Sequence, residues 1–111
     1  MNESDVIRLQ HMREAANKAI SFASGKTRAD LDDDEKLVLS LVKCIEIIGE
    51  AASKISKECE TECSNIPWAD IIGMRNRLIH AYFDINLNIV WKTVTEELGP
   101  LVYELDQALR K

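Results

Sequence analysis

The fold is decided by residues 37–55, which read LVLSLVKCIEIIGEAASKI. Apolar residues recur in this stretch every three or four positions, which is the spacing of one buried face on an amphipathic helix. The positions on that face are Leu37, Val38, Leu41, Cys44, Ile45, Ile48, Ala52 and Ile55. Small residues beside it, among them Gly49 and Ser53, leave room for a second helix to approach closely. We therefore predict a long helix that extends to about Glu58.

The residues before this helix predict its start and one earlier helix. Residues 30–35 read DLDDDE, and carboxylates are favoured in the first turn of a helix because the peptide dipole is positive there. We interpret this acidic run as the start of the central helix rather than as a metal site. Asn2 and Asp5 have the spacing of a helix-capping pair, and the apolar periodicity that follows them ends near Ser24, before Gly25. A first helix is therefore expected up to about Ser24.

The residues after the central helix predict two further helices. Pro67 suits the first turn of a third helix, whose apolar positions continue to Tyr82. Asp84 or Asn86 can cap a fourth helix. The Gly-Pro pair at 99–100 is expected to break or kink that helix, leaving a final short helix or a bent continuation.

The whole pattern predicts an all-α fold. No segment alternates polar and apolar residues with the period of a half-buried strand. The 111 residues suffice for one domain, 1–111, and are too few for two ordinary domains. We expect an antiparallel bundle of four main helices plus a short or kinked C-terminal helix.

Composition favours a protein of the cytoplasm. The N-terminal residues MNESD lack the basic and then apolar character of a secretory signal, and no apolar run approaches the roughly 20 residues of a membrane span. Three cysteines are an odd number for a disulfide framework, and Cys59 and Cys63 have no histidine nearby to complete a zinc site. We therefore expect reduced thiols, no metal, no cofactor and no membrane partner.

The charge distribution restricts any nucleic-acid contact to one short stretch. A net charge of −5 argues against a generally basic nucleic-acid binder, so DNA is not expected as a partner. Residues 71–83 nevertheless hold Arg75, Arg77 and His80 without a single carboxylate. This stretch is the one place suited to an anion such as an RNA phosphate.

The residue types in this stretch suit cleavage of RNA. The Arg75 guanidinium can hold phosphate oxygens through paired donors, and His80, with a pKa near neutrality, can accept or donate a proton. RNA supplies its own nucleophile, the 2′-hydroxyl, so no metal is required. On a continuous helix Asn76 and His80 would lie one turn apart, which lets Asn76 orient His80 or the phosphate.

Two alternatives remain beside catalysis. The same arginine and histidine can hold a nucleotide without cutting RNA, as in a regulatory subunit, or can serve only the packing of a structural bundle. Cleavage also gains from both a base and an acid, whereas the stretch holds one histidine. A homodimer that brings two His80 side chains to one groove would supply both.

The string from Gly73 to Tyr82, GMRNRLIHAY, resembles the Arg-x4-His-x-Tyr signature of HepT-like proteins in the HEPN superfamily. Residues 47–51 (IIGEA), 66–68 (IPW) and 90–91 (VW) resemble the surrounding segments of that family, so the resemblance covers nearly the whole chain.

The resemblance implies an endoribonuclease toxin of a type VII-like toxin–antitoxin pair. Such a toxin is a homodimer that cleaves RNA, and an MNT-class nucleotidyltransferase is its antitoxin. Arg75, Asn76 and His80 match the catalytic positions, and Tyr82 matches the tyrosine that such antitoxins modify with AMP. Arg77 is a candidate for a supporting role, as is Glu50, which either contacts Arg75 or Arg77 across the bundle or faces solvent.

Overall fold

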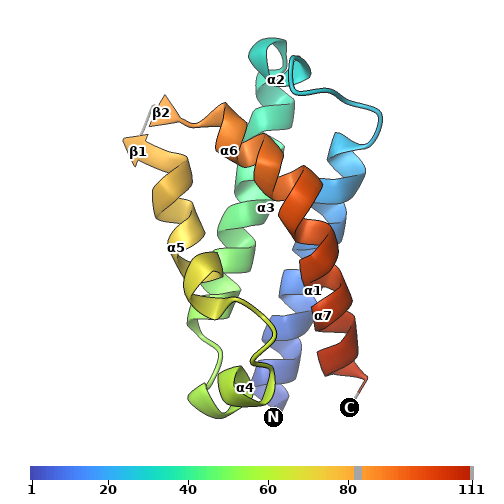
Figure 1. Cartoon of the computed structure of the whole chain (residues 1–111), viewed down its shortest axis with the longest axis vertical. Coiled ribbons are helices and arrows are strands. Elements are labelled where there is room, and N and C mark those ends of the chain that lie inside the picture. The colour runs from blue at the N-terminus through green and yellow to red at the C-terminus, as the bar shows by residue number, and fades with distance from the viewer. Residues whose placement is uncertain (82–83, 111) are drawn as a thin grey trace.

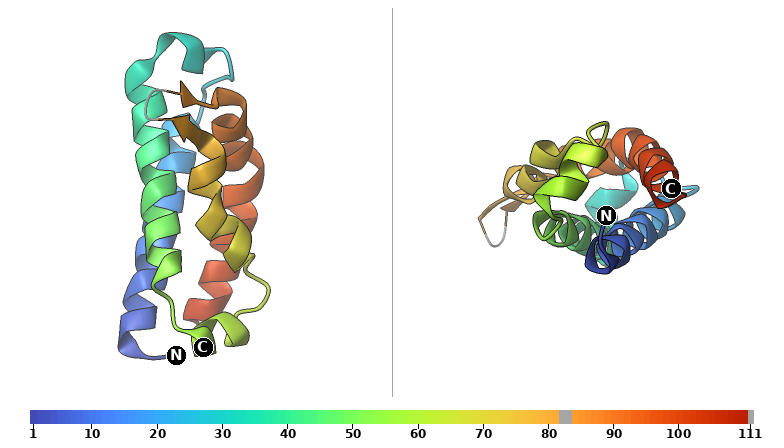
Figure 2. Two further views of the ribbon diagram at one scale, coloured as in Figure 1. Left: turned by 90° about the vertical axis from the view of Figure 1, so that its left-hand side faces the viewer. Right: turned by 90° about the horizontal axis from the view of Figure 1, so that it is seen from below.

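The computed structural model describes residues 1–81 and 84–110, apart from the side chains of Arg75 and of residues 79–81. Four helical rods run antiparallel around one core (Figure 1), and the end-on view of Figure 2 shows them around a common axis. In chain order the rods are α1 (Glu3–Ala23), α3 (Glu35–Ser53), α5 (Trp68–Leu78) and the continuous segment of α6 (Leu87–Lys92), η1 (Thr93–Glu97) and α7 (Leu98–Leu109). The predicted all-α bundle is confirmed.

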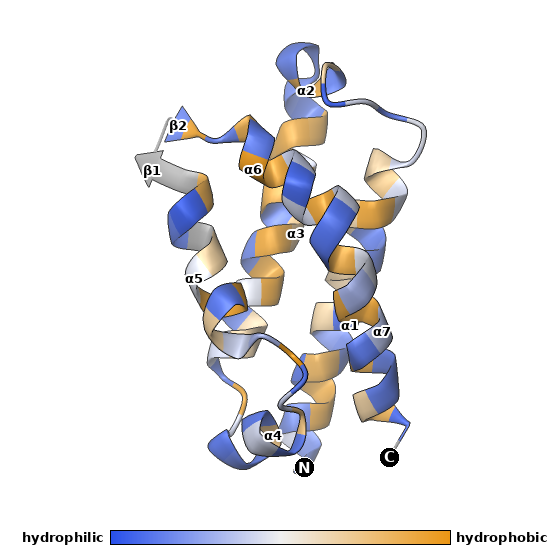
Figure 3. Ribbon diagram, in the orientation of Figure 1, coloured by the Kyte–Doolittle hydropathy of each residue, from blue (hydrophilic) through white to orange (hydrophobic). Residues whose placement is uncertain are grey.

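Each rod buries one face. Helix α3 packs against α1 on one side and α5 on the other, and α1 also packs against α7. Figure 3 shows that these helices carry both hydrophobic (orange) and hydrophilic (blue) segments. The fully buried side chains include Leu9, Leu41, Ile45, Ile48 and Leu105. No helix within residues 1–81 and 84–110 has both the length and the apolar character needed to cross a membrane.

Helix α1 begins and ends where local signals predict. The Asn2 side chain accepts a hydrogen bond of 2.7 Å from the backbone N–H of Asp5, and the Asp5 carboxylate accepts one of 3.4 Å from that of Asn2. These reciprocal bonds satisfy amide groups that have no partner inside the helix. The helix ends at Ala23, and Gly25 follows with a φ of 76°, a conformation that glycine adopts without steric cost.

The central helix begins later than predicted and ends earlier. The acidic run forms a one-turn helix, α2 (Asp30–Asp33), and Asp34 then caps α3 by accepting a 3.0 Å hydrogen bond from the N–H of Leu37. Helix α3 ends at Ser53, so the predicted extension to Glu58 is wrong. A separate short helix, α4 (Lys57–Glu62), follows and is capped by Ser56.

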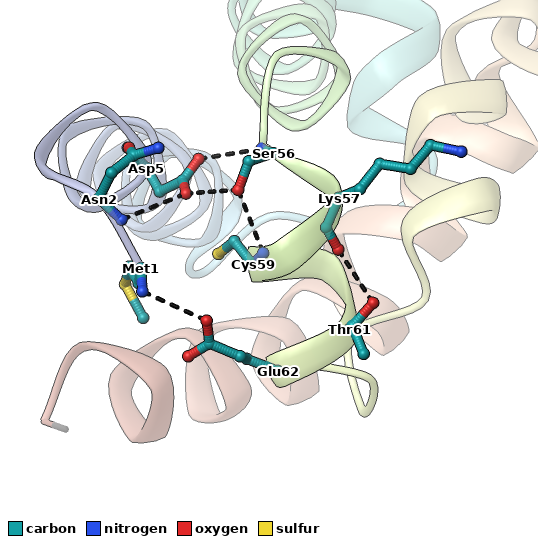
Figure 4. A network of polar contacts seen from close by, with 8 residues as sticks. All are labelled: Met1, Asn2, Asp5, Ser56, Lys57, Cys59, Thr61 and Glu62. Carbon is teal, nitrogen blue, oxygen red and sulfur yellow. Dashed lines mark hydrogen bonds and ion pairs between the residues drawn. The ribbon is translucent and has the colours of Figure 1, made fainter.

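A buried polar network explains this early end (Figure 4). The side chain of Asp5 is only 2% exposed, and its carboxylate accepts hydrogen bonds from the N–H of Ser56 at 2.9 Å and from its hydroxyl at 2.6 Å. The Ser56 hydroxyl in turn accepts from the N–H of Cys59 at 3.1 Å. Asp5 therefore joins the start of α1 to the start of α4, which requires the chain to leave α3 before Ser56.

Replacing Asp5 by alanine should destabilise the bundle by about 2–3 kcal/mol, because two partly buried donors of Ser56 lose a charged acceptor. Burial by itself raises the pKa of Asp5, but the hydrogen bonds from Ser56 and Asn2 outweigh it and hold that pKa below its usual value. The stabilisation is therefore complete above the unfolded-state pKa, at about pH 4, and is lost as the pH falls through the lower folded-state pKa. Urea unfolding of both proteins at several pH values measures this difference.

The matched control for this prediction is Asp33→Ala, because Asp33 is an exposed carboxylate. It should change the free energy of unfolding by less than about 0.5 kcal/mol. An Asp5→Ala protein as stable as the parent, or a stability difference that does not shrink in acid, would contradict the role given to the network.

The third helix ends four residues before the predicted end at Tyr82. Helix α5 ends at Leu78, and the chain then forms the strand β1 (Ile79–Ala81), which pairs antiparallel with β2 (Asp84–Ile85). The carbonyl of Leu78 accepts a 2.8 Å hydrogen bond from the N–H of Asn86. This bond replaces the next helical one, so the expected continuous helix is wrong at this point. Tyr82 itself lies outside the described residues.

The last rod resolves two alternatives. Asn86, not Asp84, caps α6, because its side chain accepts a 3.1 Å hydrogen bond from the N–H of Ile89. The Gly-Pro pair at 99–100 bends the helix instead of breaking it. A π-helical turn precedes Pro100, with the N–H of Leu98 bonded to the carbonyl of Thr93. The wider turn accommodates a proline ring that would crowd the carbonyl four residues earlier.

Candidate functional site

The motif residues lie where a helix changes into a strand. Arg75, Asn76 and Arg77 belong to the last turns of α5, whereas His80 lies in β1. The expectation that Asn76 and His80 share one helical face is therefore wrong. In the ladder Ile79 lies opposite Ile85 and Ala81 opposite Asp84, which leaves His80 as the extra residue of a bulge.

A bulge of this kind is common beside active sites, because one inserted residue bends the strand and redirects a side chain. The backbone positions of Arg75 and His80 are thus five residues apart but belong to two different elements. Their side chains lie outside the described part of the structure, so their catalytic roles remain predictions, as does the role of Tyr82.

Asn76 and Glu50 line one groove. The groove lies between α3 and α5, has a volume of about 210 Å³ and is also lined by Gly49, Ser53 and Ile72. The small residues bring the two helices close, since a Cβ at Gly49 would lie 3.5 Å from the carbonyl oxygen of Ile71. The structure therefore places the predicted supporting residue Glu50 beside the predicted catalytic residue Asn76.

Glu50 and Arg77 contact different partners in the described structure. Glu50 pairs with Lys54 one turn further along α3, at 3.1 Å. Arg77 donates a 3.3 Å hydrogen bond to the backbone carbonyl of Asp70, and its guanidinium lies 3.8 Å from the Asp70 carboxylate. Glu50 and Arg77 thus do not form the pair that the sequence left open. Residues 71–83 contain no carboxylate, but Asp70, the residue just before them, supplies one to Arg77.

Arg77 also lines a different cavity from Asn76. This cavity, of about 60 Å³, lies between α5 and the last rod and includes Met74, Glu97 and Leu101. The two neighbouring residues Asn76 and Arg77 therefore line different sides of α5. An arginine held by Asp70 on the far side is a poor candidate for contact with a phosphate in the Asn76 groove.

Two apolar side chains lie exposed near the Asn76 groove. Ile72 of α5 is 41% exposed and lines the groove itself, and Ile47 of α3 is 38% exposed, one turn before Glu50. The other large apolar residues of α5, Trp68, Ile71 and Leu78, are buried. The helix predicted to be apolar around much of its circumference thus leaves one isoleucine outside the core.

Cys59 does not supply a nucleophile at neutral pH. Cys44, Cys59 and Cys63 are all free thiols in the described structure. Burial, with the neighbouring Cys63, raises the pKa of Cys59 to about 12, so its thiolate is scarce at neutral pH. Among the described residues, no group of three or more histidine, cysteine, aspartate or glutamate side chains is arranged to hold a metal ion.

Comparison with known proteins assigns the chain to a family. Residues 12–108 match the family described as "Ribonuclease HepT-like". The chain belongs to the HepT-like ribonuclease family. This confirms the resemblance that the sequence suggested over nearly the whole chain.

Curated relatives of similar length support the assignment to HepT-like ribonucleases. A protein of Caldanaerobacter subterraneus subsp. tengcongensis, named "Putative RNase", is 35% identical over 103 residues, covering 93% of this chain and 92% of its own. A Thermococcus cleftensis protein named "Probable ribonuclease HepT" is 33% identical over 103 residues, covering 93% of both chains. A Methanocaldococcus jannaschii protein named "Putative RNase" is 31% identical over 98 residues, covering 88% of this chain and 90% of its own. No solved structure matches the chain significantly.

Membership in the HepT-like ribonuclease family gives the junction of α5 and β1 a functional context. The six residues 75–80 at this junction include two arginines, one asparagine and one histidine. These groups can bind a phosphate and move protons, which is the chemistry that phosphodiester cleavage requires.

Proposed function

We propose that this HepT-like chain is a metal-independent endoribonuclease of the cytoplasm and the toxin of a type VII-like toxin–antitoxin pair. One HEPN-type domain, residues 1–111, would carry the activity. The observation that supports the proposal best is the placement of the Arg75-to-His80 motif at a helix–strand junction of a HepT-like bundle.

In the proposed reaction the 2′-hydroxyl of RNA attacks the adjacent phosphorus. His80 removes the hydroxyl proton or, in the second subunit, gives a proton to the leaving 5′-oxygen. The P–O5′ bond breaks as the P–O2′ bond forms, so the products are a 2′,3′-cyclic phosphate and a 5′-hydroxyl. Arg75 stabilises the additional negative charge on the phosphate oxygens, and Asn76 orients the phosphate or His80.

The proposed enzyme is a homodimer with its site between the subunits. The α3–α5 face carries the exposed apolar side chain Ile72, which lines the same groove as Asn76. Pairing this face with a second copy would cover Ile72 and would bring two His80 residues together. RNA is the proposed substrate, and neither a cofactor nor DNA is assigned a role.

The proposed partner is an MNT-class nucleotidyltransferase that silences the toxin by attaching AMP to Tyr82. An attached AMP would add bulk and negative charge two residues after His80, where it would repel an RNA phosphate. Incubation with the cognate enzyme and ATP should therefore increase the mass of the parent by AMP additions and leave Tyr82→Phe unchanged. Tyr103, which is 62% exposed on α7, offers the matched control, since Tyr103→Phe should be modified like the parent.

Two results would contradict this role of Tyr82. AMP on Tyr82→Phe would place the modification at another residue. Full inhibition of an unmodified parent by the nucleotidyltransferase would show that the partner acts by covering the site.

Cleavage of total RNA in the presence of a chelator tests the proposed function. The enzyme should generate new RNA ends that disappear with His80→Ala. Nucleotide binding without any cleavage would instead support a regulatory subunit of a nucleotidyltransferase complex. If an intact dimer neither cleaves RNA nor binds nucleotides, the motif has only a structural role.

A further inference from the structure

A second and larger groove lies between α1 and α3. Its volume is about 390 Å³, which is within the range of ligand-binding sites. Its lining combines basic, acidic and small apolar side chains: Arg8, His11, Lys43, Glu46, Ile47, Glu50, Ala51 and Lys54. The sequence gives no local signal for this groove, because its cations come from two helices far apart in the chain.

Arg8 is the cation that α1 contributes to this groove. Its Nε atom is buried and has no hydrogen-bond partner within the described part of the chain. A buried guanidinium donor without an acceptor is costly, and the acceptors that match it best are carboxylate and phosphate oxygens. Arg8 as a whole is partly exposed and lines the groove, so its guanidinium is placed to meet a bound anion.

The positive charge of the groove is not fully neutralised by its own carboxylates. Lys54 is paired with Glu50 at 3.1 Å. Arg8 and Lys43 then outnumber the one remaining lining carboxylate, Glu46, by one. In a chain of net charge −5, this local excess favours a polyanion.

The two grooves meet at Glu50, which lines both of them. Helix α3 lies between α1 and α5, as Figure 2 shows, so the α1–α3 groove and the Asn76 groove flank the same helix. An extended ligand in the Asn76 groove can pass over the Glu50–Lys54 pair into the α1–α3 groove. There it would meet Arg8 and Lys43.

We propose that the α1–α3 groove binds phosphates of the RNA strand outside the cleavage site. The inference rests on the proposed ribonuclease function, and Arg8, His11 and Lys43 are the residues assigned to phosphate binding. RNA is favoured over an acidic protein segment because the groove shares Glu50 with the one that Asn76 lines, where the scissile phosphate is proposed to bind. An RNA strand held in the Asn76 groove must place the phosphates of its neighbouring nucleotides close to that groove.

RNA binding by a cleavage-deficient protein tests this assignment. In a His80→Ala background, a labelled single-stranded RNA is titrated at several salt concentrations. Lys43→Gln should weaken binding about 3- to 10-fold at 0.1 M salt and should reduce the slope of log Kd against log salt by about 0.7, as expected for one lost phosphate contact. Arg8→Gln should act in the same direction.

Lys36→Gln is the matched control. Lys36 is exposed on α3 two turns before Lys43 and does not line the groove. It should leave both Kd and the salt slope unchanged. Since Lys43 is exposed, its replacement should preserve the fold even if Arg8→Gln proves unstable.

Several outcomes would overturn the inference. If Lys43→Gln and Lys36→Gln bind RNA with the same Kd and the same salt slope, the groove has no part in RNA binding. Loss of nucleotidyltransferase binding or of dimerisation, with RNA affinity intact, would make the groove a protein contact. Cleavage by the parent with no effect of Lys43→Gln rejects only the groove, whereas weakened RNA binding by Lys43→Gln without any cleavage by the parent rejects only the nuclease.

Discussion

His80→Ala should reduce the rate of RNA cleavage by about 10²- to 10⁴-fold, because it removes the group that moves protons in both halves of the proposed reaction. Arg75→Ala should reduce it by about 10²- to 10³-fold through loss of charge stabilisation on the phosphate. Cleavage of a labelled RNA under single-turnover conditions measures both rates.

Arg77→Ala is the informative comparison for this prediction. It removes the same type of side chain two residues from Arg75, but Arg77 is held by Asp70 on the other side of α5. It should keep activity within a few-fold of the parent. Circular dichroism and a dimer assay on each variant separate catalysis from folding. Cleavage at the parental rate by His80→Ala or Arg75→Ala would remove that residue from the mechanism.

Mixing subunits should show a second large effect. If each site needs His80 from both subunits, random exchange of equal amounts of parent and His80→Ala leaves about a quarter of the dimers fully active. Activity should therefore fall to about a quarter of the parent's, rather than to the half that simple dilution gives. The measurement is the initial cleavage rate after subunit exchange.

Half of the parental activity after verified exchange would mean that each subunit works alone. A stable monomer at micromolar concentration that cleaves RNA would contradict the composite site directly. Replacing Ile72, 41% exposed on the proposed contact face, by glutamate provides such a monomer if the α3–α5 face is the interface.

The parts of the fold that the sequence predicts well depend on neighbouring residues. Asn2 and Asp5 start α1, Gly25 ends it and Asn86 starts α6, and each acts through a hydrogen bond or a backbone angle within a few positions. The central helix was predicted from its apolar spacing for the same reason, since helical periodicity is visible in any window of two or three turns.

The parts of the fold that the sequence does not predict depend on contacts between residues far apart in the chain. Helix α3 ends at Ser53 because Ser56 is held by Asp5, 51 positions earlier in the chain. Helix α5 ends at Leu78 because the N–H of Asn86 takes its carbonyl. Both stretches have helical character on their own, so only the folded chain decides where the helix stops.

The candidate site shows the same division. Residue type and spacing were enough to single out Arg75, Asn76 and His80, whereas Glu50 was suggested by the family resemblance. They could not show that His80 lies in a strand or that Arg77 is occupied by Asp70. The groove of Arg8 and Lys43 was invisible, because it exists only where α1 and α3 lie side by side.

The chemical identity of the RNA ends produced in a chelator tests the central claim most directly. Attack by the 2′-hydroxyl predicts a 2′,3′-cyclic phosphate on one fragment and a 5′-hydroxyl on the other, formed by the parent without added metal and absent with His80→Ala. Fragments that carry a 3′-hydroxyl and a 5′-phosphate, or cleavage that stops when metal is removed, would contradict the proposed mechanism.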